Sequence, residues 1–322
     1  AVGLKLLFEW EGWYTTATTA AVLFVVGFTV WSFVIEGRRR AKDRFATTLI
    51  YGSFVAAIVP LVLILVYIGV KGFSVFSVDF FLRSMSGVTS QQEGGGLYHA
   101  LLGTLEIVAI ATVIALPIGI FTAIYLVEYG RGKFARTVTF FVDVMTGIPS
   151  IVAGLFVYTF LLLGFGLRPF GLAGSLALAI LMIPVLVRSS EEMLKLVPRD
   201  LREASYALGV PKWRTILKVV LPTAMSGLIT SSLLAIARVT GETAPLILLV
   251  GYSSRISYDP LQGDMATLPM MIWDQLGKRA GTTSSDLTEA RAWGAALTLV
   301  LLVLILNVGA RLLARLFQPK AR

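Results

Sequence analysis

The amino-acid sequence predicts an all-α protein, a polytopic bundle of membrane-spanning helices. Three observations lead to this class: 56% of the 322 residues are hydrophobic, only 15% are charged, and the mean hydropathy is +0.81. Soluble domains average about 45–50% apolar and about 25% charged residues. A soluble globular enzyme and a disordered chain are therefore both poor interpretations. Because the chain has no Cys, disulfide frameworks, Cys-ligated metal sites and thiol catalysis are excluded.

Seven segments are long and apolar enough to cross a membrane, since a spanning helix needs about 20 apolar residues to cover about 30 Å of hydrocarbon. The expected spans are residues 16–35, 47–70, 100–127, 137–163, 170–187, 223–251 and 293–317. The fourth span is interrupted near its start by Gly147 and Pro149. The neighbouring hydroxyls of Thr146 and Ser150 are candidates to line a polar path there.

The distribution of basic residues predicts the orientation, because short cytoplasmic loops carry an excess of Lys and Arg. Nineteen of the 28 Lys and Arg residues follow spans one, three, five and seven, eight lie on the opposite side, and Arg238 lies within a span. We therefore expect a multi-pass protein of the plasma (inner) membrane with its amino terminus outside and its carboxyl terminus in the cytoplasm.

The spans also predict a division of the chain. Residues 1–45 form an extra amino-terminal span with a basic linker, and residues 46–322 form the core. Two outward segments, 71–99 and 252–292, are expected to be solvated and partly mobile surface. The sequence starts at Ala1 without a Met and without the basic start of a signal peptide, which leaves open whether residues precede it.

One inward segment, residues 188–222, is large enough to do more than turn the chain. Pro198 suits a first helical turn and Gly209 suits the position after a helix end, which predicts a short helix over 199–208. Pro211 then begins a second helix. A short amphipathic helix with small residues on its apolar side fits a groove in a partner. It equally fits an interfacial helix that rests on anionic lipid.

The spacing in this segment resembles the EAA signature of ABC-importer permeases, which pairs Glu-Ala-Ala and a Gly with a later Ile-x-Leu-Pro. The sequence departs from it at Ser205, in place of the second Ala, and at Val219, in place of Ile. The resemblance implies a coupling helix that sits in a groove of an ATPase subunit. The matching residues are Glu203, Ala204, Ser205, Gly209, Leu221 and Pro222.

Arg238 and Glu242 lie in the sixth expected span, where ionisable groups are costly and mark transport pathways. Four residues apart on a helix, they stack on one face and can neutralise each other. Arg offers a planar set of donors suited to oxyanions. Gly241 and Pro245 loosen the helix, so that backbone N–H groups can point at an anion. The structural alternative is a closed ion pair that only fixes helix packing.

The string ARVTGETAPL, residues 237–246, resembles the phosphate ABC-transporter permease family in its PstA-type form. Three further segments agree with that family: AIYLVEY at 123–129, GIPSIVAGLF at 147–156 and VRSSEEML at 187–194. The match runs from about Phe45 to the end of the chain. The resemblance implies a type I ABC-importer permease fold with a six-span core, to which this chain adds one span. It also implies a permease subunit of an ATP-driven importer of inorganic phosphate, which forms half of the translocation path.

The same resemblance implies roles for single residues. Arg238 and Arg188 match positions that belong to the phosphate path, as oxyanion contacts or gates, and Glu242 would keep Arg238 oriented. Arg188 has a competing explanation as an ordinary Arg at a cytoplasmic span end that reaches for headgroups. Thr146 and Ser150 complete the expected path. We expect no catalytic residue and no metal site, because a lone His supports neither.

The sequence contains no GxxxxGK[ST] loop, so the chain should not bind ATP through that motif. We therefore expect a transport subunit that is not itself an enzyme, with ATP and Mg²⁺ bound by partner subunits. The resemblance implies two PstB-type ATPases, a PstC-type permease as pseudo-symmetric partner and an extracytoplasmic phosphate-binding protein. Membrane lipid surrounds the chain, and no nucleic-acid partner is expected.

Three other functions remain open from the residues. A gradient-driven secondary transporter also places Arg and Glu at depth in broken helices, but it does not need a segment like 203–222. An intramembrane enzyme with Glu242 as general base would need a nucleophile or metal ligands, for which one His and no Cys leave little. A permease for another oxyanion shares the EAA spacing but lacks the GETAPL and PSIVxG strings.

Overall fold

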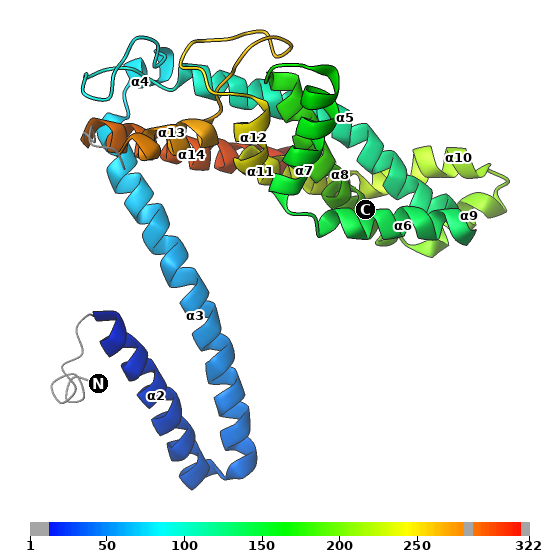
Figure 1. Ribbon diagram of the computed structural model, residues 1–322. Helices are drawn as coiled ribbons and strands as arrows, with labels where there is room; N and C mark the ends of the chain where they lie inside the picture. The colour runs from blue at the N-terminus through cyan, green and yellow to red at the C-terminus, as the bar shows by residue number, and fades with distance from the viewer. Residues whose placement is uncertain (1–12, 280–285, 317–322) are drawn as a thin grey trace. The chain divides into compact units, whose positions relative to one another are not determined.

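The computed structural model describes residues 13–279 and 286–316, and within these residues the chain is almost entirely helical and has no strand (Figure 1). Six helices in this part of the chain are long and apolar enough to cross a membrane. A seventh crossing results if a pair of helices bent by 107° counts as one span. The predicted class, an all-α multi-pass membrane protein, is confirmed.

The chain divides into two compact units, residues 1–67 and 68–322. The first unit contains α2 (Trp13–Glu36) and most of α3 (Arg38–Gly72). Between the two helices Gly37 adopts φ 82°, a left-handed conformation that only Gly enters without strain. This glycine lets the chain reverse in a single residue.

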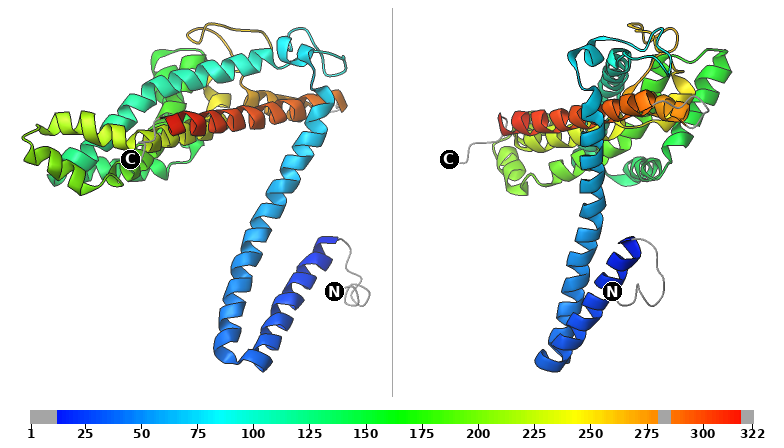
Figure 2. Two further views of the ribbon diagram at one scale, coloured as in Figure 1. Left: turned by 180° about the vertical axis from the view of Figure 1, so that it is seen from behind. Right: turned by 90° about the vertical axis from the view of Figure 1, so that its left-hand side faces the viewer.

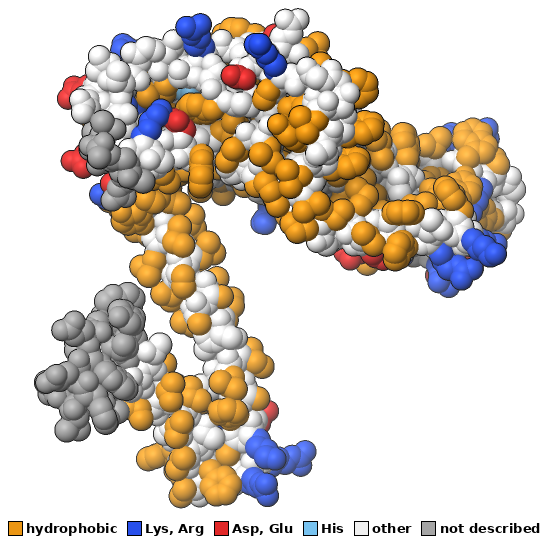
Figure 3. Space-filling model, in the orientation of Figure 1, with side chains coloured by type: hydrophobic (Ala, Val, Ile, Leu, Met, Phe, Trp, Pro, Cys, Tyr) orange, Lys and Arg blue, Asp and Glu red, His pale blue; other side chains and the backbone are white. Residues whose placement is uncertain are grey.

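Both helices of the first unit expose apolar side chains along most of their length, as expected of helices that face lipid. Lys and Arg side chains gather at the turn between them (Figure 3). The predicted division after residue 45 falls within α3, which continues without a break from Arg38.

The second unit continues with short helices, long spans and several local breaks. In chain order its elements are η1 (Phe73–Val75), α4 (Val78–Leu82), α5 (Tyr98–Ile124), η2 (Tyr125–Tyr129), α6 (Gly132–Thr146), α7 (Ser150–Val157), η3 (Tyr158–Leu163), α8 (Gly171–Lys195), α9 (Arg199–Ala207), α10 (Lys212–Thr215), η4 (Ile216–Val220), α11 (Leu221–Thr240), α12 (Ala244–Leu249), α13 (Leu268–Arg279) and α14 (Asp286–Leu316).

The centre of the second unit is the packing of α5 against α8, which run side by side (Figures 1 and 2). A Cβ at Gly119 of α5 would lie only 2.6 Å from the Cβ of Leu186 on α8. Small residues allow such close approach, and van der Waals packing then holds the helices together in lipid. The buried Ala side chains of this core are Ala111, Ala115, Ala173, Ala177, Ala179 and Ala235.

The two ends of the second unit differ in character. Helices α9 and α10 lie at one end, and α4 and the segment around α13 lie at the other (Figures 1 and 2). The prediction that 71–99 and 252–292 are solvated and partly mobile surface is wrong for residues 265–271, which are buried, and for single side chains of 71–99. Most of 73–94 and all of 252–264 are exposed or half-buried, and residues 280–285 lie outside the described residues. The buried apolar side chains of the two segments pack into a second core, formed by Phe80, Met85, Leu97, Ala266, Leu268 and Met271 together with Ala100 and Ala295.

The sixth span is predicted over 223–251, and the observed helix differs from this prediction at both ends. The observed helix begins at Lys212, runs through α10, η4 and α11, and ends at Thr240. The second helix that Pro211 is expected to begin is therefore the first part of the candidate span Lys212–Thr240. Residues 241–243 interrupt the helix before α12, and Leu249 ends that short helix.

Substitution of Gly119 by Ile should weaken the α5–α8 packing, because the new side chain overlaps Leu186. Overpacking of a core costs about 1–3 kcal/mol, or roughly 2–10 °C in melting temperature. Thermal unfolding of the purified protein in detergent measures the change. Gly52→Ile is the matched control, since nothing lies within 4 Å of a Cβ at that helical glycine; equal melting temperatures of the two variants would contradict the packing role.

Candidate functional site

Two helix breaks define the candidate site. The first separates α6 from α7, where residues 147–149 connect Thr146 to Ser150 and the helices bend by 107°. Pro149 cannot donate a backbone hydrogen bond and disfavours a helical conformation at Ile148 before it. The predicted interruption of the fourth span is confirmed. The second break separates α11 from α12, between Thr240 and Ala244.

The two breaks lie together because α7 packs on α12. A Cβ at Gly154 would lie 2.8 Å from the Cα of Pro245, so only a residue without a side chain permits this approach. Gly154 belongs to the PSIVAG string and Pro245 to the GETAPL string. Tertiary packing thus joins two motifs that are about 90 residues apart in the sequence.

A cavity of about 220 Å³ lies where the breaks meet. A water molecule takes about 30 Å³ in the liquid, so the cavity has room for a small polyatomic anion. Its polar side chains come from Thr146, Ser150, Arg238 and Glu242, and its remaining wall from Met145, Ile148, Pro149, Leu181, Pro184, Val185 and Val239. Four of the five predicted pathway residues therefore line one cavity.

Arg238 and Glu242 do not form the predicted helical pair. Helix α11 ends at Thr240, so Glu242 lies in the break and not one turn above Arg238 on the same face. Within the described residues, no hydrogen bond or ion pair joins the two side chains. The exposed Arg238 guanidinium therefore faces the cavity without a carboxylate partner.

The two hydroxyls of the cavity differ in what they can offer an anion. Thr146 Oγ1 donates to the Val142 carbonyl at 2.8 Å, so its proton is already used. Ser150 Oγ has no hydrogen-bond partner among the described residues. Ser150 also begins α7, where the first backbone N–H groups have no partner within the helix and carry partial positive charge.

Arg188 lies outside this cavity, about one turn beyond Pro184 and Val185 on α8. Its guanidinium donates to Asp143 of α6 and, at 2.8 Å, to Glu191 of its own helix. Glu191 also accepts from Lys195 at 2.6 Å. The carboxylate of Glu191 is only 12% exposed. Arg188 is thus engaged by two carboxylates and ties α6 to α8.

Arg188 and Arg238 should respond differently to truncation. Arg188→Met leaves the little-exposed Glu191 with one cation fewer and removes the α6–α8 link, so we expect a loss of about 1–2 kcal/mol, discounted for partial exposure. Arg238→Met removes no ion pair and should leave stability unchanged. Thermal unfolding of both variants in detergent measures the difference, and a larger loss for Arg238→Met would show that its lack of a partner is misassigned.

The residues that match the EAA signature lie in and near α9 and α10 or at the start of α11, towards the end of the second unit that carries α9. Helix α9, predicted over 199–208, is observed as Arg199–Ala207, and Gly209 follows with φ 73°. The Ser205 hydroxyl is buried and lies 2.8 Å from that of Thr215, which joins α9 to α10. Leu221 and Pro222 begin α11. The departure at Ser205 therefore supplies a polar contact between the two helices.

The surface of this segment exposes both charged and apolar side chains. Glu203 and Ala204 are exposed, and Leu208 is 83% exposed at the end of α9. The exposed apolar side chains of the segment are Leu196, Leu201, Tyr206, Leu208, Trp213 and Leu217.

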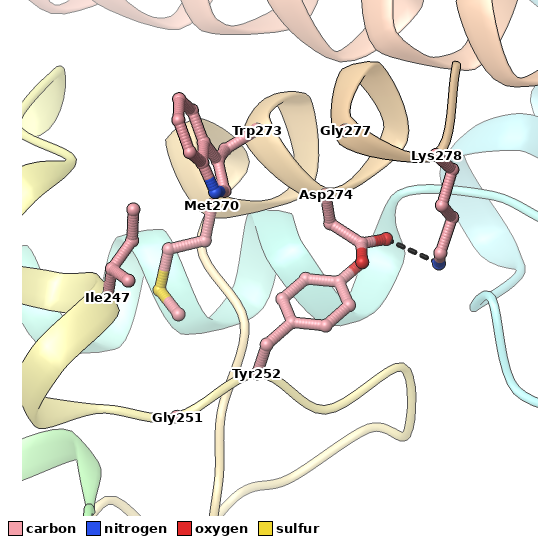
Figure 4. A pocket seen from close by; sticks show the side chains of 8 residues that line it. All are labelled: Ile247, Gly251, Tyr252, Met270, Trp273, Asp274, Gly277 and Lys278. Atoms are coloured by element: carbon pink, nitrogen blue, oxygen red, sulfur yellow. Dashed lines mark hydrogen bonds and ion pairs between the residues drawn. The ribbon is translucent and has the colours of Figure 1, made fainter. Parts of the chain in front are cut away.

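A further cavity of about 340 Å³ lies between α12 and α13 (Figure 4). Its single cation, Lys278, is paired with Asp274 at 2.6 Å. The hydroxyl of Tyr252 faces Asp274, and burial, reinforced by that carboxylate, raises the pKa of the phenol. Apolar walls and a closed ion pair make this cavity a poor anion site. Sequence analysis missed it because its residues come from a segment expected to be surface.

No group of three or more potential metal ligands occurs in residues 13–279 and 286–316. Residue-type patterns also missed the partners of Arg188, since Asp143 lies on another helix. Glu128 and Arg202 were likewise missed as a pair, because they are 74 residues apart.

Comparison with known proteins places these features in a family. Residues 115–322 match the binding-protein-dependent transport system inner membrane components. The chain is 49% identical over 277 residues to the phosphate transport system permease protein PstA 1 of Mycobacterium tuberculosis strain H37Rv, which spans 86% of this chain and 88% of that protein. The PstA protein of Yersinia pestis is 40% identical over 277 residues, or 85% of this chain and 90% of that protein.

A solved structure of the MetNI methionine ABC transporter in an inward-facing conformation is similar in fold, with a TM-score of 0.56 and 21% identity. The alignment covers 69% of this chain and 96% of that chain. Fold, helix breaks and sequence together define a membrane permease component of binding-protein-dependent transport systems. Within this class, the chain belongs to the PstA family of phosphate transport system permease proteins.

Proposed function

We propose that this chain is a permease subunit of an ATP-driven importer of inorganic phosphate. The observation that carries the proposal is the unpaired Arg238 in a cavity at two helix breaks, in a chain 49% identical to PstA proteins. The guanidinium and the free Ser150 hydroxyl both donate hydrogen bonds, which suits the oxygens of phosphate. Glu242 lines the same cavity and weakens anion binding by charge repulsion, which favours release.

The substrate path is proposed to run through this cavity towards the end of the second unit that carries α9. Arg188 lies next along α8 in that direction, tied to Asp143. A phosphate leaving the cavity would compete with the Asp143 carboxylate for the guanidinium. Arg188 then acts as an inner gate, and the Asp143–Arg188 pair closes it when no anion is present.

Coupling to ATP hydrolysis is proposed to pass through α9 and its exposed apolar surface, with Glu203 on the partner-facing side. Helix α9 is joined to α10 by the Ser205–Thr215 contact. The helix that begins with α10 then continues to Arg238, 26 residues further on, or about 39 Å at 1.5 Å per residue. Movement of α9 therefore reaches the cavity through one continuous helix.

The proposed assembly contains a PstC-type permease, two PstB-type ATPases that bind ATP and Mg²⁺, and an extracytoplasmic phosphate-binding protein. This chain would contribute no ATPase site of its own. The end that carries α9 would face the cytoplasm, as the distribution of Lys and Arg predicts, and the end that carries α13 would face outwards. Alternating access would follow from rocking of the spans around the cavity.

Phosphate uptake by vesicles that contain the whole importer tests the substrate role. Arg238→Gln should leave assembly intact and lower uptake about 100-fold, the usual cost of losing one positioned donor to an oxyanion. Arg136→Gln is the control, since it makes the same change at an exposed Arg outside the cavity. Uptake by Arg238→Gln at the rate of the control variant would contradict a role of Arg238 in binding phosphate. If sulfate competes with phosphate equally well, a permease for another oxyanion is favoured instead.

The coupling role is tested with Glu203→Lys in the same vesicles. Charge reversal on the exposed side of α9 should release the ATPases, or leave them bound with ATP hydrolysis that no longer drives uptake. Co-purification of the ATPases and the ratio of phosphate transported to ATP hydrolysed are the two measurements. Normal values of both would contradict the coupling role of α9, and uptake without ATP would favour a gradient-driven carrier.

A further inference from the structure

A little-exposed ion pair connects α9 to η2, which continues the central helix α5. Arg202 of α9 donates to Glu128 Oε1 through Nε at 3.0 Å and through Nη2 at 2.8 Å. The side chains are only 14% and 5% exposed, respectively. Burial of two charges is costly and is offset only when the geometry is good and other hydrogen bonds are made. The position of this pair is therefore closely specified.

Further hydrogen bonds surround this pair. The Arg202 guanidinium also donates to the carbonyls of Val197 at 2.6 Å and Leu194 at 3.0 Å, at the end of α8. Lys212 of α10 donates to the Glu128 backbone carbonyl, and its ammonium lies 4.6 Å from the centre of the Tyr129 ring. Residues 128 and 129 thus contact α9 and α10 at once.

The backbone around Glu128 departs from a regular α-helix. Residues Tyr125–Tyr129 form a widened turn, η2, in place of regular α-helix, and such turns frequently occur at functional sites. The widened turn frees carbonyl groups at the helix end, one of which accepts from Lys212. Gly132 then reverses the chain into α6 with φ 79°.

The opposite end of α5 is fixed just as closely to the segment before α13. A Cβ at Gly103 would lie 2.2 Å from the carbonyl oxygen of Ala266. Thr104 Oγ1, itself buried, accepts from the backbone N–H of Leu268 at 2.8 Å. Glu128 follows Thr104 by 24 residues of one candidate span, or about 36 Å of helix.

We propose that Glu128 is a positioning residue which joins α9 to α5, so that α5 carries movement between the coupling segment and the segment 265–268 at the other end of the second unit. The inference rests on the proposed function and deepens it. Helix α11 connects α9 to the cavity, and α5 connects α9 to the end where a substrate-binding protein would dock. Glu128 is thus needed for a loaded binding protein to stimulate ATP hydrolysis.

Glu128→Gln in the complete importer tests the link, because Gln keeps the shape and one acceptor oxygen but removes the charge. We expect assembly and basal ATP hydrolysis to remain, while stimulation by phosphate-loaded binding protein falls at least fivefold, with a parallel fall in uptake. Glu192→Gln is the control, an exposed Glu on α8 that makes the same charge change. Normal stimulation in Glu128→Gln, or loss of the ATPases from its complex, would overturn the proposal.

The double variant Glu128→Gln/Arg202→Gln separates this role from simple bracing. Removing both charges relieves the cost of an unpaired charge at low exposure. If the pair only stabilises the fold, stimulation of ATP hydrolysis by the loaded binding protein should therefore return to normal in the double variant. If the pair transmits movement, stimulation should remain at least fivefold below wild type, which is the result we expect. Recovery of wild-type stimulation would overturn the proposal.

A covalent replacement of the pair offers the converse test, since the chain has no Cys of its own. Glu128→Cys/Arg202→Cys should lose stimulation, regain it when a short reversible thiol cross-linker joins the two residues, and lose it again on reduction. Each single Cys variant is the control for reaction with partner subunits. Cross-linking without recovery would overturn the proposal, whereas wild-type uptake in the same vesicles tests the importer function separately.

Discussion

The structure depends on one constraint: helices that lie in hydrocarbon can be interrupted only where the freed backbone groups face protein or a polar cavity. Both interruptions that form the candidate site obey it. The break before Ser150 and the break after Thr240 open onto the same cavity of about 220 Å³. Because α7 and α12 follow these breaks and pack on each other through Gly154 and Pro245, the two breaks lie together.

Two arginines of the second unit, Arg188 and Arg202, are paired with carboxylates. Arg188 is held by Asp143 of α6 and by Glu191 of its own helix, and Arg202 of α9 is held by Glu128 of η2. The carboxylates of Glu191 and Glu128 are little exposed. Arg238 has no such partner, and it lines the cavity. Arg238 is exposed, so its guanidinium is open to an anion that enters the cavity. This contrast, rather than the presence of Arg in a span, supports the assignment of the site.

The packing of small residues links this site to the rest of the unit. Gly119 allows α5 to approach α8, and Gly103 allows it to approach Ala266. Close backbone approach leaves little freedom for one helix to slide past the other, because packed helices have few alternative arrangements. In the proposed mechanism, movement of α9 is shared between the helix Lys212–Thr240, which contains Arg238, and the candidate span Tyr98–Tyr129, which contains Glu128.

The sequence by itself determined the helical class, the approximate spans, the interruption at Pro149 and the helix before Gly209. These features depend on composition, on apolar runs and on the backbone limits of Pro and Gly, which act within a few residues. Residue types and family resemblance together gave Arg238, Glu242, Arg188, Thr146 and Ser150 as the expected path, and four of these five residues do line one cavity.

Only the tertiary structure decided which of these residues share a site and which charges are paired. Family resemblance gave Arg188 and Arg238 the same expected role, although Arg188 also fitted an ordinary Arg at a span end. The structure shows that Arg188 is paired with Asp143 on another helix. The spacing of Arg238 and Glu242 suggested a helical pair, but the helix ends between them. The segments 71–99 and 252–292 looked like surface, because their Gly and polar residues hid the few apolar side chains that bury together. Contacts between distant segments arise from packing, and local patterns carry no information about them.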